Sequence, residues 1–128
     1  MAHRILIADD DPSTLEGLRA LLMAWGYEVE TAPDGRAALE KIASLRPAAV
    51  ITDVVMPVMT GLELLDALRI ARPAPPVIVL SAHSSLDALL IATAAGAFAY
   101  LTKPVEVAKL KALLISALTE ATWATTVL

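Results

Sequence analysis

The stretch Ala48–Pro57, with the sequence AAVITDVVMP, decides the fold of this chain. A short apolar and β-branched run leads directly into Asp53, and Pro57 prevents a regular continuation. The pattern predicts a buried central strand that carries one carboxylate at its C-terminal end. A buried strand rarely ends on an ionised carboxylate unless that group is paired or takes part in chemistry. The residues that arrive beside Asp53 therefore indicate what the chain does.

Length and composition restrict the class of protein. The chain has 128 residues, and we expect one domain over residues 1–118, with 119–128 as a C-terminal tail or the start of a linker. Hydrophobic residues make up 57%, but charges interrupt them, and we expect no transmembrane helix or signal peptide. Without cysteine there is no disulfide or zinc–cysteine site, and we expect a cytoplasmic location. The net charge of −4 and the lack of a Lys/Arg cluster argue against direct nucleic-acid binding by this domain.

Five strand-like runs alternate with five segments of helical periodicity. Besides the central run, strands are expected at Ile5–Ala8, Glu28–Ala32, Val77–Leu80 and Ala99–Thr102. Helices are expected from Pro12 up to Gly26, from Asp34 up to Pro47, from Thr60 and Gly61 up to Pro73, from Ser84 or Ser85 to about Ala95, and over roughly Val105–Leu118.

This alternation predicts a parallel sheet with helices on both faces, because strands joined through helices run parallel with right-handed crossovers. Glu28–Ala32 alternates polar and apolar residues and belongs at an edge, whereas the continuously apolar runs belong inside. The strand order 2-1-3-4-5 meets both demands. The predicted fold is therefore α/β, a flavodoxin-like (βα)5 doubly wound fold with a five-stranded parallel sheet.

Polar residues follow four of the five strands at the carboxyl edge of the sheet, where such folds bind ligands. They are Asp9 and Asp10, Asp53, Ser81 and Lys103. Three neighbouring carboxylates repel one another unless a cation neutralises them, and oxygen ligands without His or Cys favour Mg²⁺. Asp53, in the centre, is then the expected nucleophile, giving an acyl phosphate. Lys103 and Ser81 are expected to contact the phosphoryl oxygens.

These residues resemble those of one family, the receiver domain of two-component response regulators. The resemblance extends over residues 3–118 and rests on the run Ile5–Asp11, the stretch Thr52–Pro57 with Gly61, Ser81–Ala82, and Lys103–Pro104. It implies a phosphoprotein of phosphorelay signal transduction, in which Asp53 accepts a phosphoryl group from a phosphohistidine on a sensor histidine kinase or phosphotransfer protein. It also implies no enzyme in the ordinary sense, since such a domain catalyses only its own phosphoryl transfer and dephosphorylation.

The resemblance further implies a role for each site residue. Asp10, Asp53 and the main-chain carbonyl of Val55 would coordinate Mg²⁺, and Asp9 would assist through water. Ser81 and Lys103 would sense the phosphoryl group. Tyr100 matches an aromatic switch position whose side chain turns inward when Ser81 moves, although an ordinary half-buried strand tyrosine is the alternative.

The fourth helix is apolar on all sides, since Leu86, Leu89, Leu90 and Ile91 cannot all face the sheet. We expect some of them to be exposed, and the fourth helix, fifth strand and fifth helix to form a face that controls an output partner or a homodimer. Val55 cannot orient an attacking water, so we expect slow hydrolysis of the acyl phosphate. His83 is expected either near the mouth of the site or as a solvated loop residue. Asp11 is expected to be a loop or helix-cap acid and not a ligand.

Other functions fit the residues less well. A haloacid-dehalogenase-like phosphatase would need a second acid where Val55 stands, and Asp9–Asp11 would repel a flavin phosphate. Neither G-x-x-x-x-G-K-[ST] nor G-x-G-x-x-G occurs, which argues against nucleotide binding. A receiver that is never phosphorylated remains a rival reading. The sequence also leaves open a stand-alone regulator or a receiver joined to a DNA-binding, ATPase or kinase module.

Overall fold

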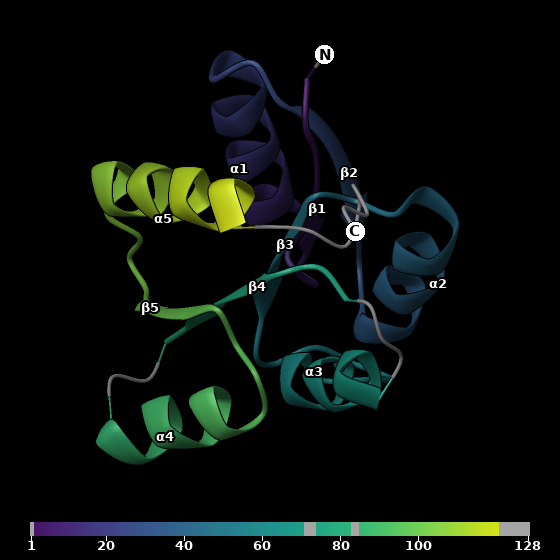
Figure 1. The fold of residues 1–128 in the computed structure, drawn as a ribbon, viewed down its shortest axis with the longest axis vertical. Coiled ribbons are helices and arrows are strands. Elements are labelled where there is room, and N and C mark those ends of the chain that lie inside the picture. The colour runs from purple at the N-terminus through teal and green to yellow at the C-terminus, as the bar shows by residue number, and fades with distance from the viewer. Residues whose placement is uncertain (1, 71–73, 83–84, 121–128) are drawn as a thin grey trace.

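Strands and helices alternate throughout the computed structural model, which describes residues 2–70, 74–82 and 85–120 (Figure 1). His83, Ser84 and residues 121–128 lie outside the described residues, so the expectations for His83 and for the tail have no structural counterpart. The elements are β1 (Arg4–Ala8), α1 (Pro12–Ala24), β2 (Glu28–Ala32), α2 (Gly35–Leu45), β3 (Ala49–Asp53), α3 (Gly61–Ile70), β4 (Val77–Ser81), α4 (Leu86–Ala94), β5 (Ala99–Thr102) and α5 (Val107–Glu120).

The five strands form one parallel sheet in the order β2-β1-β3-β4-β5, which confirms the predicted strand order. The register places Thr52 of β3 between Ala8 of β1 and Val79 of β4. Ser81, the last residue of β4, pairs with Thr102 of β5. The residues that follow these strands therefore meet at one edge of the sheet.

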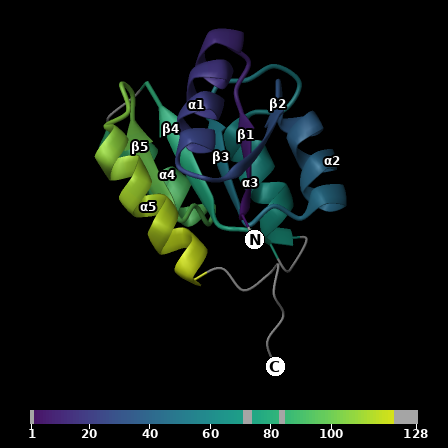
Figure 2. The same cartoon turned by 90° about the horizontal axis from the view of Figure 1, so that it is seen from above.

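Two hydrophobic cores lie on opposite faces of the sheet. Figures 1 and 2 show α1 and α5 covering one face and α2, α3 and α4 covering the other. Alternate strand residues supply the two cores, because successive side chains of a strand point to opposite faces. The α2–α3 side contains Leu6, Ala8, Val50, Val77, Val79, Ile42, Leu64 and Leu68. The α1–α5 side contains Ile5, Ile7, Ile51, Ile78, Leu80, Leu22, Leu110 and Leu114.

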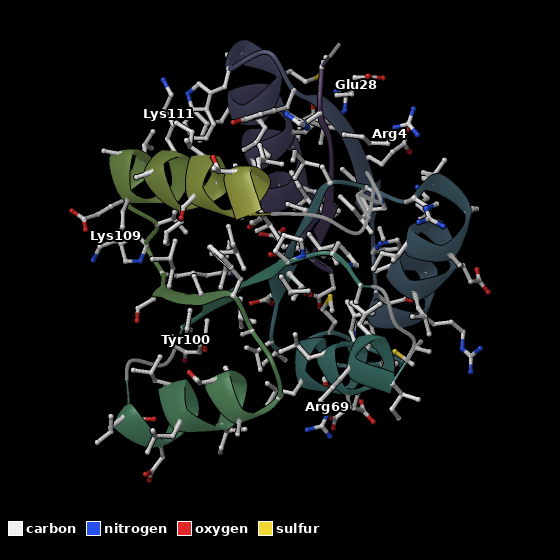
Figure 3. All side chains as sticks on the ribbon, in the orientation of Figure 1. Arg4, Glu28, Arg69, Tyr100, Lys109 and Lys111 are labelled. Carbon is white, nitrogen blue, oxygen red and sulfur yellow. The ribbon has the colours of Figure 1, made fainter. Side chains whose placement is uncertain are left out.

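The outer strand β2 is protected by charged side chains, as expected for an exposed edge. Lys41 of α2 donates from Nζ to the Thr31 carbonyl oxygen over 2.6 Å and lies 3.6 Å from Glu30 Oε1. At the other end of the strand, Arg4 lies 3.7 Å from Glu28, and both are labelled in Figure 3. These contacts keep a half-polar strand at the edge of an otherwise apolar sheet.

Local side chains define the helix starts. Asp34 caps α2 by accepting a hydrogen bond from the Ala37 amide, and Ser85 caps α4 through the Ala88 amide. Thr60 and Glu63 form a reciprocal capping box at the start of α3, since each side chain accepts from the other residue's amide.

The last helix begins at Val107, two residues later than the sequence predicted, and it extends to Glu120. The reason is that Val105 packs against the core on the α1–α5 side instead of entering the helix. The Leu110 amide then donates to the Glu106 carbonyl oxygen, which closes the first helical turn.

Helix α4 exposes all four of the large apolar residues of which the sequence predicted that some would be exposed. Leu86, Leu89, Leu90 and Ile91 are 68%, 40%, 56% and 55% exposed, and Ala92 is its buried residue. Among the described residues, no helix combines the length and hydropathy needed to cross a membrane.

Candidate functional site

Three carboxylates converge at the carboxyl edge of the sheet. Asp9, Asp10 and Asp53 each offer an oxygen that lies within 4.8 Å of those of the other two. Asp9 and Asp53 follow and end the neighbouring strands β1 and β3, whose Ala8 and Thr52 stand side by side in the register. Asp9 is buried, Asp53 is half-buried and Asp10 is exposed. The structure thus brings together the three acids that the sequence singled out.

Lys103 supplies the positive charge of the site from the end of β5. Its Nζ lies 3.1 Å from Asp53 Oδ1 and 3.4 Å from Asp9 Oδ2, so that one cation bridges two carboxylates. The Lys103 amide donates to the Ser81 carbonyl oxygen over 2.7 Å and continues the pairing of β4 with β5. The long side chain then spans β4 to reach the centre of the sheet.

The surroundings of the site shift the pKa values of Asp53 and Lys103. Burial is the largest effect on Asp53 and raises its pKa, and the negative charge of Asp9 raises it further. The hydrogen bond and the charge of Lys103 lower this pKa, but they offset the other effects only in part. Burial alone would lower the pKa of Lys103, but its hydrogen bond to Asp53 and the charges of Asp53 and Asp9 outweigh burial and raise that pKa. Both pKa values are therefore higher than those of the free side chains, that of Asp53 mainly through burial and that of Lys103 through its two carboxylate partners.

Asp11 stays outside this acidic group and caps α1, as the sequence predicted. Its side chain accepts hydrogen bonds from the Thr14 hydroxyl over 2.7 Å and from the Ser13 amide over 3.2 Å. Both hydrogen bonds lower the pKa of Asp11, and the bond from Thr14 has the larger effect. The Asp11 amide in turn donates to Asp9 Oδ1 over 2.9 Å, so the helix start also orients Asp9.

Ser81 and Tyr100 lie at a cavity beside the acidic group. Ser81 is buried at the end of β4, and Tyr100 extends from β5 toward α4 (Figure 3). The cavity has a volume of about 530 Å³ and is lined by Val54, Leu62, Ser81, Ser85, Asp87, Ala88, Ile91 and Tyr100. The sequence did not predict this cavity, because it depends on how far α4 stands from the sheet and no residue pattern encodes that distance.

The turn between β3 and α3 carries the remaining predicted ligand, the main-chain carbonyl of Val55. The Val54 amide donates to the Leu80 carbonyl oxygen, and the Val54 carbonyl accepts from the Gly61 amide over 2.9 Å. The Val55 side chain is 65% exposed and, being apolar, offers the site no hydrogen-bonding group. The turn thus begins directly at Asp53 and is held at the start of α3.

The donor set suits a hard divalent cation. Carboxylate and main-chain carbonyl oxygens are the ligands that Mg²⁺ prefers in proteins, and it usually keeps several waters. The exposed Asp10 leaves one side of the acidic group open to water. The chemistry of Asp9, Asp10 and Asp53 therefore fits a magnesium ion.

Comparisons with known proteins agree with this geometry. The family model described as "Response regulator receiver domain" matches residues 5–115. The chain is similar to "Response regulator MprA" of Mycolicibacterium vanbaalenii, with 47% identity over 104 residues, which cover 81% of this chain and 45% of the relative. It is also similar to "Transcriptional regulatory protein PrrA" of Mycobacterium leprae, with 44% identity over 109 residues, which cover 85% of this chain and 47% of the relative.

A solved structure supports the same family assignment. The chemotaxis protein CheY4 of Vibrio cholerae superposes with a TM-score of 0.85 at 35% identity, over 91% of this chain and 99% of that one. The chain spans slightly under half the length of the two relatives that it matches by sequence.

Proposed function

Because the chain belongs to the response regulator receiver domain family of two-component signalling, we propose that Asp53 accepts a phosphoryl group from a phosphohistidine. The donor would be a sensor histidine kinase or a phosphotransfer protein. The observation that carries this proposal is the position of Asp53, which is partly buried beside Asp9 and lies 3.1 Å from the Lys103 ammonium that the two carboxylates share. A carboxylate nucleophile needs this kind of oriented, partly dehydrated setting.

Each residue of the site has a part in the transfer. One Asp53 oxygen attacks phosphorus while the phosphorus–nitrogen bond breaks, and the imidazole leaves with the electron pair. Lys103 holds the attacking carboxylate in place and can then pair with the new phosphoryl oxygens, because its flexible stem allows both positions. Asp10, Asp53 and the Val55 carbonyl would hold Mg²⁺, with Asp9 assisting through water, and the bound cation would offset the charge of the phosphoryl oxygens.

Phosphorylation would then change the face formed by α4, β5 and α5. The phosphoryl group adds about −1.5 to −2 charges, and the Ser81 hydroxyl can move toward its oxygens. Tyr100 could turn into the cavity beside Ser81, whose volume of about 530 Å³ accommodates a phenol ring. The new position of α4 would alter how its exposed leucines contact an output partner or a second copy of the chain.

The domain would act as a switch and not as an enzyme on other substrates, because the chemistry that we propose begins and ends on Asp53. A cytoplasmic location remains a prediction that accords with a kinase donor. Transcription control is one output that the name of the PrrA relative suggests for the whole protein.

Intact mass spectrometry after incubation with acetyl phosphate and Mg²⁺ tests the acceptor. We expect one added phosphoryl group in the wild type and none in Asp53→Asn. Asp66→Asn is a matched control, because Asp66 is an exposed carboxylate on α3 that pairs with Arg69 on the surface. A wild-type chain that gains no mass, or Asp53→Asn that still gains it, would contradict the proposal.

Light scattering tests the output. Beryllofluoride mimics the phosphoryl group, and we expect it to increase the mass of the wild type in solution. Leu90→Lys should keep the phosphorylation and lose the added mass, because Leu90 is 56% exposed on α4 and lies away from the acidic group. The same mass with and without beryllofluoride would exclude self-association.

A further inference from the structure

Thr52 places a fully buried hydroxyl directly beneath the proposed phosphoryl acceptor. Its exposed fraction is 0%, and its register partners, Ala8 and Val79, belong to the apolar core on the α2–α3 side. A hydroxyl in such surroundings is costly unless it is hydrogen-bonded. Thr52 Oγ1 donates to the Asp53 carbonyl oxygen over 3.0 Å and also lies 4.0 Å from Met56 Sδ. The bond therefore joins the strand to the turn that follows it.

The Asp53 carbonyl is also the point of closest approach for helix α3. A Cβ atom added to Gly61 would overlap the Asp53 carbonyl oxygen, and the Gly61 amide donates to the Val54 carbonyl oxygen over 2.9 Å. Only a residue without a side chain fits there, so α3 presses its first turn against the backbone of the acceptor.

The far end of the turn is held in a similar way. The Gly35 amide of α2 donates to the Met59 carbonyl oxygen over 3.0 Å, and a Cβ atom on Gly35 would overlap Met59. All five glycines lie within the described residues, and Gly35 and Gly61 are the two whose added Cβ would meet other atoms within 4 Å. Both contacts restrain the segment 54–60, so this turn is fixed at its ends and Thr52 fixes its origin.

We propose that Thr52 is a positioning residue, whose hydroxyl orients the Asp53 peptide so that the Asp53 carboxylate and the Val55 carbonyl face the same cation. The inference rests on the proposed function, since it requires that the site binds Mg²⁺. Thr52 lies beneath Asp53 on the core side, where its hydroxyl contacts the Asp53 carbonyl oxygen and Met56, so it would touch neither a bound cation nor a phosphoryl group. Its contribution is preorganisation, because without the hydroxyl the cation would have to order the turn when it binds.

The substitutions Thr52→Val and Thr52→Ser separate the hydroxyl from the methyl group. Val keeps the shape and removes the hydrogen bond, whereas Ser keeps the hydrogen bond and removes the methyl group. The net effect of one hydrogen bond predicts that Thr52→Val binds Mg²⁺ roughly threefold to tenfold more weakly than the wild type. Thr52→Ser should bind within about twofold of the wild type, because its hydroxyl can reach the same carbonyl.

Isothermal titration calorimetry with Mg²⁺ measures these affinities, and urea denaturation in EDTA measures the stability of each metal-free chain. A purely structural role predicts the opposite ranking, since loss of the buried methyl group would harm Ser and spare Val. Equal Mg²⁺ affinity in Thr52→Val and the wild type would overturn the positioning role while the proposed function stands. A wild-type chain that binds no Mg²⁺ would overturn both.

Discussion

The substitution Asp53→Asn should stabilise the metal-free protein although it removes a salt bridge. At an effective dielectric constant of about 20, Lys103 at 3.1 Å attracts Asp53 by about 5 kcal/mol, and Asp9 within 4.8 Å repels it by about 3.5 kcal/mol. The exposed Asp10 adds a repulsion of about 1 kcal/mol, since water screens it more strongly. The attraction and repulsion nearly cancel, so the cost of burying the ionised carboxylate decides the sign.

That cost is visible in the raised pKa of Asp53, for which burial is the largest cause. An asparagine carries no charge and therefore avoids the cost of burying an ionised carboxylate. We expect Asp53→Asn to increase the free energy of unfolding by about 1 kcal/mol near neutral pH. The pKa of Asp53 in the folded chain lies above its value of 3.8 in an unfolded one, so the folded state binds this proton more tightly. The advantage of asparagine is therefore complete above the folded-state pKa, shrinks as the pH falls through it, and disappears below 3.8.

Urea denaturation followed by far-UV circular dichroism, in EDTA and then in Mg²⁺, provides the assay. Mg²⁺ at about 100 times its dissociation constant should stabilise the wild type by about 2.7 kcal/mol and Asp53→Asn by less, so the order of stability reverses. Asp66→Asn controls for the loss of one negative charge and should change stability by no more than about 0.5 kcal/mol. A metal-free Asp53→Asn that is less stable than the wild type, or a gain independent of pH, would refute the reasoning.

Three further predictions concern other parts of the site. Lys103→Met should lower the free energy of unfolding without metal by about 1 to 3 kcal/mol, because Asp9 and Asp53 lose the ammonium that they share. Differential scanning calorimetry measures this loss, and an unchanged melting temperature would contradict the role of Lys103 as a bridge between the two carboxylates. Val55→Asn should shorten the lifetime of the acyl phosphate, since an amide beside the acceptor can orient water; loss of radiolabelled phosphate measures this, and an unchanged decay rate would count against it. Gly61→Ala should cost more than about 2 kcal/mol in urea denaturation, because its Cβ meets the Asp53 backbone, whereas Gly17→Ala, with open space around it, should be neutral or stabilising.

The strand order and the acidic group could be predicted because short sequence patterns encode them. Alternation in Glu28–Ala32 identified the edge strand, and the parallel arrangement carried Asp9, Asp53 and Lys103 to one edge. Helix starts were predictable where a side chain caps its own helix, as Asp34 does.

Features that depend on contacts between distant segments could not be predicted. Val58 has a φ of 68°, a backbone conformation that β-branched residues rarely adopt. Two contacts of the neighbouring Met59 hold the turn in this conformation: its amide donates to the Pro57 carbonyl oxygen, and its backbone lies close to Gly35. Propensity alone would place Val58 in a strand. Likewise, the sequence could place Lys103 at the site but could not show that its ammonium bridges Asp9 as well as Asp53, because that depends on the reach of one side chain.

Helix α4 buries little of its side-chain surface against the sheet, and we expect it to open more readily than α3. Ala92 is its one fully buried side chain, and burying an alanine methyl group contributes on the order of 1 kcal/mol, whereas α3 buries Leu64, Leu65 and Leu68. Local opening costs least where the fewest apolar contacts are lost, so α4 amides should exchange with deuterium well before those of α3. Under the proposed function, a helix with so little buried surface would let phosphorylation of Asp53 redistribute its conformations at small energetic cost, while the strands would stay in place.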